Sequence, residues 1–262
     1  SQPPDPTSPA STTFNRSDCD TLYRLIKARR DIRSFISKPI PEDILQRILE
    51  AAHHAPSVGF MQPWNFIIIE SKATRQTIKQ SFTITNEKHA GMVPDTDRKT
   101  LYQSLKLEGI MESAMNIAIT CDHKRDAPFV LGRTAMPETD LYSTCLAVEN
   151  LWLAARAEGI GVGWVSILNA AKVSRILELP EHVTLVAYLC VGYPAEFRDT
   201  PLLEDVGWKK RAPLSSVIFK EKWIIPHEDD RPRKVRTNCF SRPDFDFFNV
   251  TCAPLTDEEN PL

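Results

Sequence analysis

A dense run of charge at residues 29–35, RRDIRSF, is the first stretch of the sequence that can bind a charged ligand. A planar guanidinium binds phosphate through paired hydrogen bonds, and Arg29 and Arg33, four positions apart, can converge on one anion. A solvated basic helix end is the alternative, and these residues alone do not separate the two. We expect the arginines to keep Asp31 between them ionised, although Asp31 can also serve only to neutralise them.

A second stretch, APSVGFMQPWNF at residues 55–66, sets small and polar residues between a helical pattern and an apolar run. It is longer than a connecting turn requires, and it offers several hydrogen-bonding groups next to a buried strand. This composition is typical of a loop that lies against a flat, partly polar ligand. We call residues 57–66 the lip.

Two further stretches lie late in the chain. The run GIGVG at residues 159–163 follows a helical pattern and precedes a strand, whereas the dinucleotide-binding fingerprint has the reverse order. We therefore predict that Gly159 caps the helix and that Gly161 and Gly163 allow close backbone approach. The basic run GWKKRAPL at residues 207–214 is either a second side of the anion site or an exposed charge run.

Metal and hydrolase chemistry have little support. His53 and His54 end a helical pattern without a partner at metal-ligand spacing, so we expect a structural role for them and no metal site. The cysteines form no C-x-x-C pair, and no G-x-S-x-G motif is present. Cys121, Cys145 and Cys190 lie in apolar stretches, which predicts reduced core residues.

Composition narrows the class of protein. The chain has 262 residues and a net charge of −2, which offers no general electrostatic attraction to nucleic acid or to an anionic membrane. No apolar run approaches the roughly 18 residues of a membrane span, and the first residues lack the pattern of a secretory signal. We therefore expect a cytoplasmic protein without nucleic-acid or membrane partners.

Apolar periodicity predicts the elements that position these stretches. Helices are expected at residues 19–30, 41–55, 74–82, 100–115 and 141–158, and strands at 64–70, 116–122, 161–168 and 182–194. The expected fold class is α+β, with a central mixed sheet flanked by helices. We expect a disordered lead-in at residues 1–18, one domain at 19–224 and a C-terminal appendage at 225–262.

The order of these motifs resembles that of a known family. R-x-x-x-R-x-F, P-S-x-x-x-x-Q-P-W, G-x-G-W and R-x-P-L follow one another as in the nitroreductase-like flavoprotein superfamily. Within it, SLKLEGI, LGRT, DLYST, NLWLAARAEG and GVGWVSI resemble the BluB-type 5,6-dimethylbenzimidazole synthases, also called flavin destructases. The resemblance covers residues 20 to 223, and it implies a nitroreductase-like fold that forms a homodimer with FMN at the interface.

The resemblance also implies a set of site residues. Those expected to hold the phosphate and ribityl chain are Arg29, Arg30, Arg33 and Arg211. Those expected to line the isoalloxazine pocket are Ser57, Gly59, Met61, Gln62 and Trp64, with Leu107 and Tyr142 closing over the ring and Gly163, Trp164 and Ser166 on its other side.

The activity implied is an oxygen-dependent fragmentation of reduced FMN to 5,6-dimethylbenzimidazole, the lower ligand of cobalamin (vitamin B12), and D-erythrose 4-phosphate. Asp31 is the expected general base, Ser166 is expected to donate or relay a hydrogen bond, and both tryptophans, Trp64 and Trp164, are expected to exclude water. Reduced FMN is then both cofactor and substrate. A separate flavin reductase is expected to supply it, with NAD(P)H only an indirect reductant.

Three alternatives share these features. The first is an NAD(P)H-dependent nitroreductase or quinone reductase that retains its FMN. The second is a reductive dehalogenase, and the third a flavin carrier or regulatory protein without chemistry. Asp31 and the lip favour the synthase over the first, and Asp31 together with Ser166 favours it over the third.

Overall fold

The computed structural model describes residues 13–93 and 96–223. The chain divides into two compact units, residues 1–211 and residues 212–262. The first unit carries nearly all of the described secondary structure. Most of the expected lead-in and all of the expected appendage lie outside the described residues.

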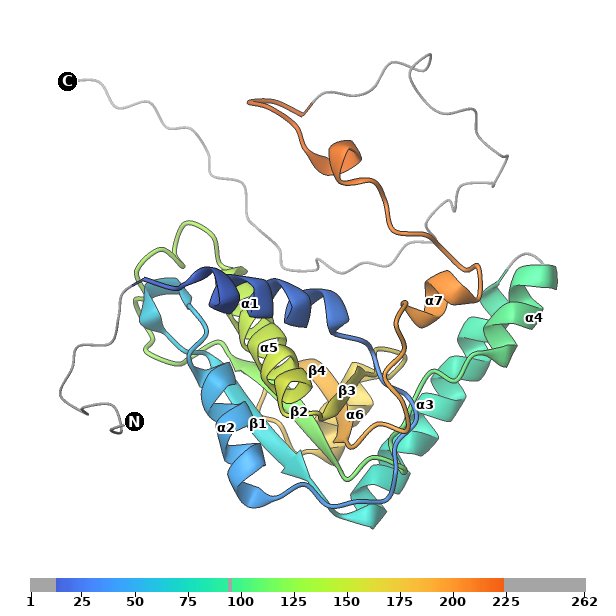
Figure 1. Cartoon of the computed structure of the whole chain (residues 1–262). Helices are drawn as coiled ribbons and strands as arrows, with labels where there is room; N and C mark the ends of the chain where they lie inside the picture. Colours follow the sequence, from blue (N-terminus) through green and yellow to red (C-terminus); the bar gives the residue numbers. More distant parts are fainter. Residues whose placement is uncertain (1–12, 94–95, 224–262) are drawn as a thin grey trace, which may run out of the picture. The chain divides into compact units, whose positions relative to one another are not determined.

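A four-stranded sheet forms the centre of the first unit (Figure 1). Its strands are β1 (Trp64–Ile69), β2 (Met115–Asp122), β3 (Gly161–Trp164) and β4 (Val183–Gly192), in the order β1-β2-β4-β3. All three neighbouring pairs are antiparallel.

The prediction of a mixed sheet is therefore wrong for the described strands. Helices between successive strands permit parallel pairing through crossovers but do not require it. The connection from β3 to β4 does contain a helix, yet it returns the chain in the opposite direction beside β3. Parallel pairing in the described residues is limited to an isolated bridge between Asp31 and Val162.

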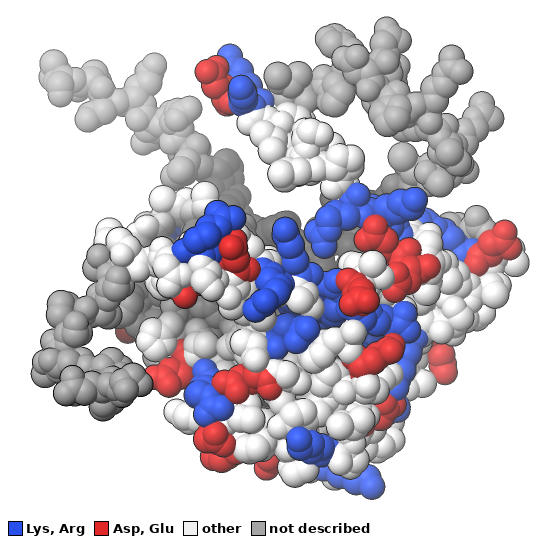
Figure 2. Space-filling view, viewed as in Figure 1, with Lys and Arg blue, Asp and Glu red and all other residues white. Residues whose placement is uncertain are grey.

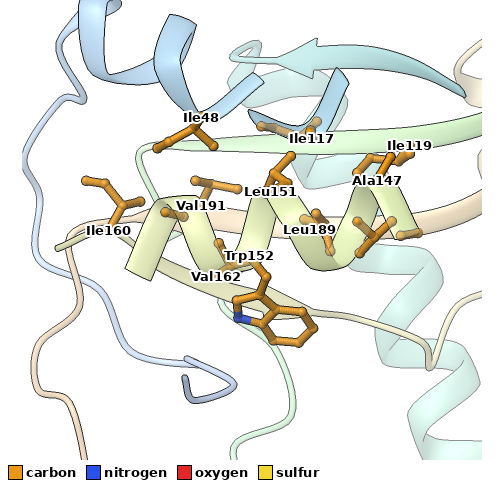
Figure 3. Packing of buried hydrophobic residues seen from close by; sticks show 14 of the residues in the cluster. Ile48, Ile117, Ile119, Ala147, Leu151, Trp152, Ile160, Val162, Leu189 and Val191 are labelled. Atoms are coloured by element: carbon orange, nitrogen blue, oxygen red, sulfur yellow. The ribbon is translucent and has the colours of Figure 1, made fainter. Parts of the chain in front are cut away.

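Two helices cover one face of the sheet, α2 (Glu42–His53) and α5 (Thr139–Ala157). Ala147 and Leu151 of α5 lie against the sheet, where Ile117 of β2 belongs to the same fully buried cluster (Figure 3). This explains the nearly continuous apolar character of α5, because the helix contacts the sheet on one side and α2 on another.

The opposite face of the sheet is covered by α3 (Lys72–Met92) and α6 (Ala170–Ile176). Ala118, Tyr188 and Cys190 point to this side, since successive side chains of a strand alternate between faces. β2 is thus buried on both faces along nearly its whole length and β4 over its second half, which accounts for the many apolar residues in both strands.

The remaining elements of the first unit lie around this sandwich. α1 (Arg16–Ala28) begins three residues before the predicted start at Cys19, because Asn15 and Asp18 form a capping box. The short elements are η1 (Val58–Phe60), α4 (Thr96–Ser104), α7 (Leu202–Asp205) and, in the second unit, η2 (Leu214–Val217).

The predicted helix at residues 100–115 is wrong beyond Ser104. The chain turns there so that Gly109 lies against the segment that carries the arginines. A Cβ on Gly109 would stand 2.5 Å from the Phe35 ring and 2.9 Å from the Arg33 carbonyl oxygen. Close approach to a distant segment overrides the local helical pattern at this position.

Other local predictions have mixed outcomes. Gly159 has a φ of 74° directly after α5, which confirms the helix cap. Cys121 and Cys190 are buried as predicted, but Cys145 is exposed on α5, so that prediction is wrong. Within the described part of the chain, no helix combines the length and apolar character needed to cross a bilayer.

Candidate active site

A cleft of about 900 Å³ opens on the first unit between the end of α1, the segment after it, the turn at residues 104–107 and the segment around α7. Lys and Arg side chains gather over this part of the surface (Figure 2). The basic residues lining the cleft are Lys27, Arg29, Arg30, Arg33, Lys106, Arg198 and Arg211. The acidic lining residues are fewer, namely Asp31, Glu149 and Glu196. The cleft therefore attracts an anionic ligand.

Asp31 lies in the wall of this cleft and is held by two partners. Its Oδ1 accepts a hydrogen bond of 2.9 Å from the backbone N–H of Trp164, at the end of β3. Its Oδ2 forms an ion pair with the guanidinium of Arg33, which also donates to the Trp164 carbonyl oxygen at 2.7 Å. Two residues from distant parts of the sequence, Arg33 and Trp164, thus fix the Asp31 carboxylate at the cleft.

Gly163 makes this arrangement possible. The N–H of Ile32 donates to the Val162 carbonyl oxygen at 2.9 Å, which brings the segment carrying Asp31 alongside β3. A Cβ on Gly163 would stand 2.0 Å from the Ile32 carbonyl oxygen and 3.0 Å from Arg33 Nη1. The structure confirms that glycine allows close backbone approach at the start of this strand.

Burial raises the pKa of the Asp31 carboxyl above its ordinary value, and this effect outweighs Arg33, the Trp164 amide and Arg29, all of which lower it. The arginines act in the expected direction by lowering this pKa, but burial outweighs them. A carboxylate with a raised pKa is a stronger base, and a perturbed pKa in a cleft is typical of a functional site.

The cleft contains buried donors without protein acceptors. Among the described residues, Nε of Arg30 and Nη1 of Arg33 are buried and make no hydrogen bond. The other Arg30 nitrogens donate to the carbonyl oxygens of Lys27, Arg29 and Asp199, so the side chain is fixed in place. Leaving a buried charged donor unpaired is costly, and acceptor oxygens of an anionic ligand would relieve this cost.

The lip has the opposite character, because its backbone is strained and its polar groups are paired. Phe60 and Gln62 have φ values of 57° and 49°, and Gly59 has 52°. A left-handed conformation costs a residue other than glycine about 1–2 kcal/mol. Ser57 Oγ accepts the Gln62 N–H at 3.0 Å, and Ser143 Oγ accepts the Val58 N–H at 3.0 Å. Such strain concentrates at functional sites.

The structure brings together only part of the predicted site. Those predicted residues that line the cleft are Asp31, Arg29, Arg30, Arg33, Leu107 and Arg211. Gly163 and Trp164 do not line the cleft, but they contact residues 31–33, of which the cleft wall is made. Ser166 lies two residues beyond Trp164, is exposed, and is not among the residues that line the cleft.

The predicted site residues of the lip do not line this cleft. Met61 and Trp64 are buried, with 1% and 3% of their surface exposed, and Trp64 Nε1 donates to His53 Nδ1 at 3.1 Å. Tyr142 is exposed at the start of α5. His53 therefore has a structural partner. Trp64 exposes too little of its ring to form a contact surface for a flavin by itself.

Sequence reasoning missed several cleft residues. Lys106 Nζ pairs with Glu112 at 2.6 Å and donates to Ser34 Oγ at 3.2 Å, so it links the turn before β2 to the arginine segment. Its place in the SLKLEGI run was a usable signal. Glu196 and Arg198 pair with each other at 3.1 Å, and nothing in their local sequence marks them as cleft residues.

The fold and the cleft define a class of protein. The model of the nitroreductase family matches residues 26–193, more than half of the chain, and the chain belongs to this family. An oxidised iodotyrosine deiodinase bound to FMN and 3-iodo-L-tyrosine shares the fold, with a TM-score of 0.60 and 22% identity, over 78% of this chain and all of that chain.

Within the family, similarity is high to one group of curated relatives. The 5,6-dimethylbenzimidazole synthase of Rhodospirillum rubrum is 43% identical over 200 residues, which cover 76% of this chain and 94% of that protein. The 5,6-dimethylbenzimidazole synthase of Rhodobacter capsulatus is 37% identical over 76% of this chain and 96% of that protein. The similarity thus spans nearly the whole of both relatives.

Proposed function

We propose that this protein is a 5,6-dimethylbenzimidazole synthase that fragments reduced FMN with molecular oxygen to 5,6-dimethylbenzimidazole and D-erythrose 4-phosphate. The observation that carries the proposal is the position of Asp31, which is fixed beside unpaired arginine donors in the wall of an anion-attracting cleft. The two synthases described above support the same reading.

The residues present fit FMN. The unpaired Arg30 Nε and Arg33 Nη1 offer donors for the phosphate, and Arg29 and Arg211 add charge around it. Leu107 and other apolar lining residues suit the ring and the carbon chain. When bound and reduced, FMN supplies the oxygen-reactive ring and the ribityl carbon that remains in the product.

Asp31 is the proposed general base for proton removal at the ribityl chain. Its two partners fix its direction, and its raised pKa makes it a better proton acceptor than an ordinary surface carboxylate. Ser166 lies on the exposed segment that follows β3, and we propose that it donates a hydrogen bond near the reacting edge of the ring.

We further propose that the site is completed by a second copy of the chain, whose lip covers the cleft. Tyr142, Leu146 and Glu149 lie on one exposed face of α5, and Glu149 lines the cleft whereas Tyr142 lies near the lip end of the helix. Phe60 of the lip and Leu131 next to it are 80% and 73% exposed. An apolar surface of this kind is typical of a protein interface.

The decisive experiment is to reduce the FMN-bound protein without oxygen, admit air and analyse the small molecules. The synthase predicts 5,6-dimethylbenzimidazole and loss of FMN. Recovery of intact FMN alone, together with turnover of a nitroaromatic compound by NADPH, would instead identify a flavin-retaining nitroreductase or quinone reductase and overturn the proposal.

The proposed dimer has its own test. Phe60→Glu places a charge in the proposed interface and should give a monomer that binds FMN poorly, whereas Ile84→Glu, at an exposed position of α3 away from the lip, should not. Sedimentation velocity and FMN titration measure both. A Phe60→Glu protein that remains a dimer with unchanged FMN affinity contradicts the assignment of this surface.

A further inference from the structure

Arg125, in the segment between β2 and α5, binds the lip through three hydrogen bonds. Its Nη1 donates to the carbonyl oxygens of Gln62 and Trp64 at 2.6 and 2.9 Å, and its Nη2 donates to Asn65 Oδ1. The side chain is 32% exposed, so it lies over the lip rather than in the core. A guanidinium suits this role because its donors form a rigid fork.

Gln62 is held from both sides. Ser57 Oγ accepts the Gln62 N–H and so orients the peptide before Gln62, and Arg125 binds the Gln62 carbonyl oxygen and so orients the peptide after it. Together the two contacts fix φ and ψ of Gln62 in the left-handed region that a residue with a side chain avoids. These angles fix the direction in which the Gln62 side chain leaves the backbone, and its Nε2 donates to the Phe60 carbonyl oxygen at 3.3 Å.

The segment that carries Arg125 is itself fixed at its base. The N–H of Asp122 donates to the Pro63 carbonyl oxygen at 2.8 Å. His123 shares hydrogen bonds of 2.8 Å with Asp140 Oδ2 and with Thr184 Oγ1, and Arg133 donates to the same Asp140 oxygen at 2.8 Å. Arg125 is therefore presented to the lip from a rigid support rather than from a freely moving loop.

The segment also touches the lip at a second point. A Cβ on Gly59 would stand 2.8 Å from the Leu131 carbonyl oxygen and 2.8 Å from a Val130 side-chain carbon. The lip is thus enclosed between Arg125 at its Gln62 end and residues 130–131 at its Gly59 end. Its conformation depends on this segment and not on its own sequence alone.

We propose that Arg125 is a positioning residue that sets the direction of the Gln62 side chain, and with it the hydrogen bonding offered to the polar edge of a bound flavin ring. The inference rests on the proposed function for the identity of the ligand. It assigns to Arg125 no contact with the flavin and no part in phosphate binding. Its consequence is that the lip fixes the orientation of the ring, while the cleft fixes the phosphate.

The test compares Arg125→Lys with the matched surface variant Arg47→Lys, whose arginine bridges Asp43 and Glu158 in solvent. Lysine keeps the charge but cannot hold three acceptors at once. For Arg125→Lys we expect FMN affinity within about threefold of the parent, because the phosphate arginines are untouched, and at least a tenfold smaller share of consumed oxygen recovered as 5,6-dimethylbenzimidazole, with hydrogen peroxide in its place. Arg47→Lys should change neither quantity.

A double-mutant cycle separates positioning from mere stability. If Arg125 acts through Gln62, the effect of Arg125→Lys on the product ratio should vanish in a Gln62→Ala background. An unchanged product ratio in Arg125→Lys, or an equal effect in both backgrounds, overturns the proposal. Should Arg125→Lys not fold, Ser57→Ala releases the other side of Gln62 and must shift the product ratio in the same direction.

The absorption spectrum of bound oxidised FMN is a second readout for Arg125→Lys that does not depend on the reaction. Arg125→Lys should shift the visible flavin bands relative to the parent, since the hydrogen bonding at the ring edge changes. If the parent forms no 5,6-dimethylbenzimidazole, the proposed function fails but this comparison still decides the role of Arg125. Identical flavin spectra for the parent and Arg125→Lys contradict that role.

Discussion

The cleft and the lip are built on opposite principles. In the cleft, buried guanidinium nitrogens of Arg30 and Arg33 lack acceptors, and a carboxylate has a raised pKa. In the lip, the backbone is strained, but Ser57 and Arg125 satisfy the groups that hold it. The cleft thus has donors to offer to an anion, whereas the groups that hold the lip are already paired within the protein. Affinity and orientation are therefore assigned to different parts of the molecule.

The largest expected effect concerns the cleft. Asp31→Asn keeps the shape of the side chain and an acceptor for the Trp164 N–H, but it removes the base. We expect formation of 5,6-dimethylbenzimidazole to fall by about 10²–10⁴-fold, with FMN affinity changed only a few-fold. Single-turnover reaction of reduced FMN with oxygen measures the rate. A variant that matches the parent rate would remove Asp31 from the mechanism.

Phosphate recognition should belong to the cleft alone. Arg29→Gln removes a guanidinium that lies over the Trp152 ring, 4.7 Å from its centroid. We expect FMN affinity to fall about tenfold or more, as for one charge-assisted hydrogen bond, and riboflavin affinity to stay the same. Fluorescence titration with both flavins checks this. An equal loss for riboflavin would place Arg29 near the ring instead.

Two glycines provide a matched comparison of the regions. Gly163→Ala forces the Ile32 carbonyl away from β3 and should weaken FMN binding along with stability, whereas Gly59→Ala should leave phosphate affinity intact and alter the product ratio. We expect each to lower the free energy of unfolding by about 1–3 kcal/mol. Denaturant unfolding and FMN titration measure the two effects.

Gly91→Ala is the control for both variants, because no atom lies within 4 Å of its added Cβ. Its stability should be unchanged or raised by up to about 1 kcal/mol, since Gly91 lies in α3. If Gly59→Ala and Gly163→Ala lower FMN affinity by the same factor, the separation of cleft and lip fails.

The pH dependence of the reaction should be a smaller effect with the same origin. The pKa of Asp31 is raised above its usual value of 3.8, so the base is lost as pH falls through that higher pKa. The rate should decline on the acid side while the protein is still folded, as circular dichroism can verify. The residual rate of Asp31→Asn should not decline in this way. If the acid-side decline persists in the variant, another group is responsible for the decline.

Much of the fold was predictable from local pattern. β2 was predicted almost to the residue, because most of its residues are apolar and it is buried on both faces. The helix predicted at residues 100–115 failed beyond Ser104, because the close approach of Gly109 to Phe35 depends on a distant segment. The prediction of strand direction was wrong for the same reason, since the sequence of one strand does not specify its pairing partner.

The site divides in a similar way. The arginines at residues 29–33 and the lip were visible in the sequence, because charge density and loop composition are local properties. Arg125 and Lys106 were missed, since their roles depend on partners far along the chain. Arg125 meets the lip about 60 positions earlier in the sequence, and no pattern around it marks that contact.

The sequence by itself determined most of the segments that form helices and strands and where cationic charge is concentrated, because periodicity and composition act over a few residues. Only the tertiary structure decided that Asp31 meets the Trp164 amide, 133 positions away, that burial raises its pKa, and that Arg125 holds the lip. Desolvation and hydrogen-bond geometry depend on everything packed around a group, and packing exists only once the chain has folded.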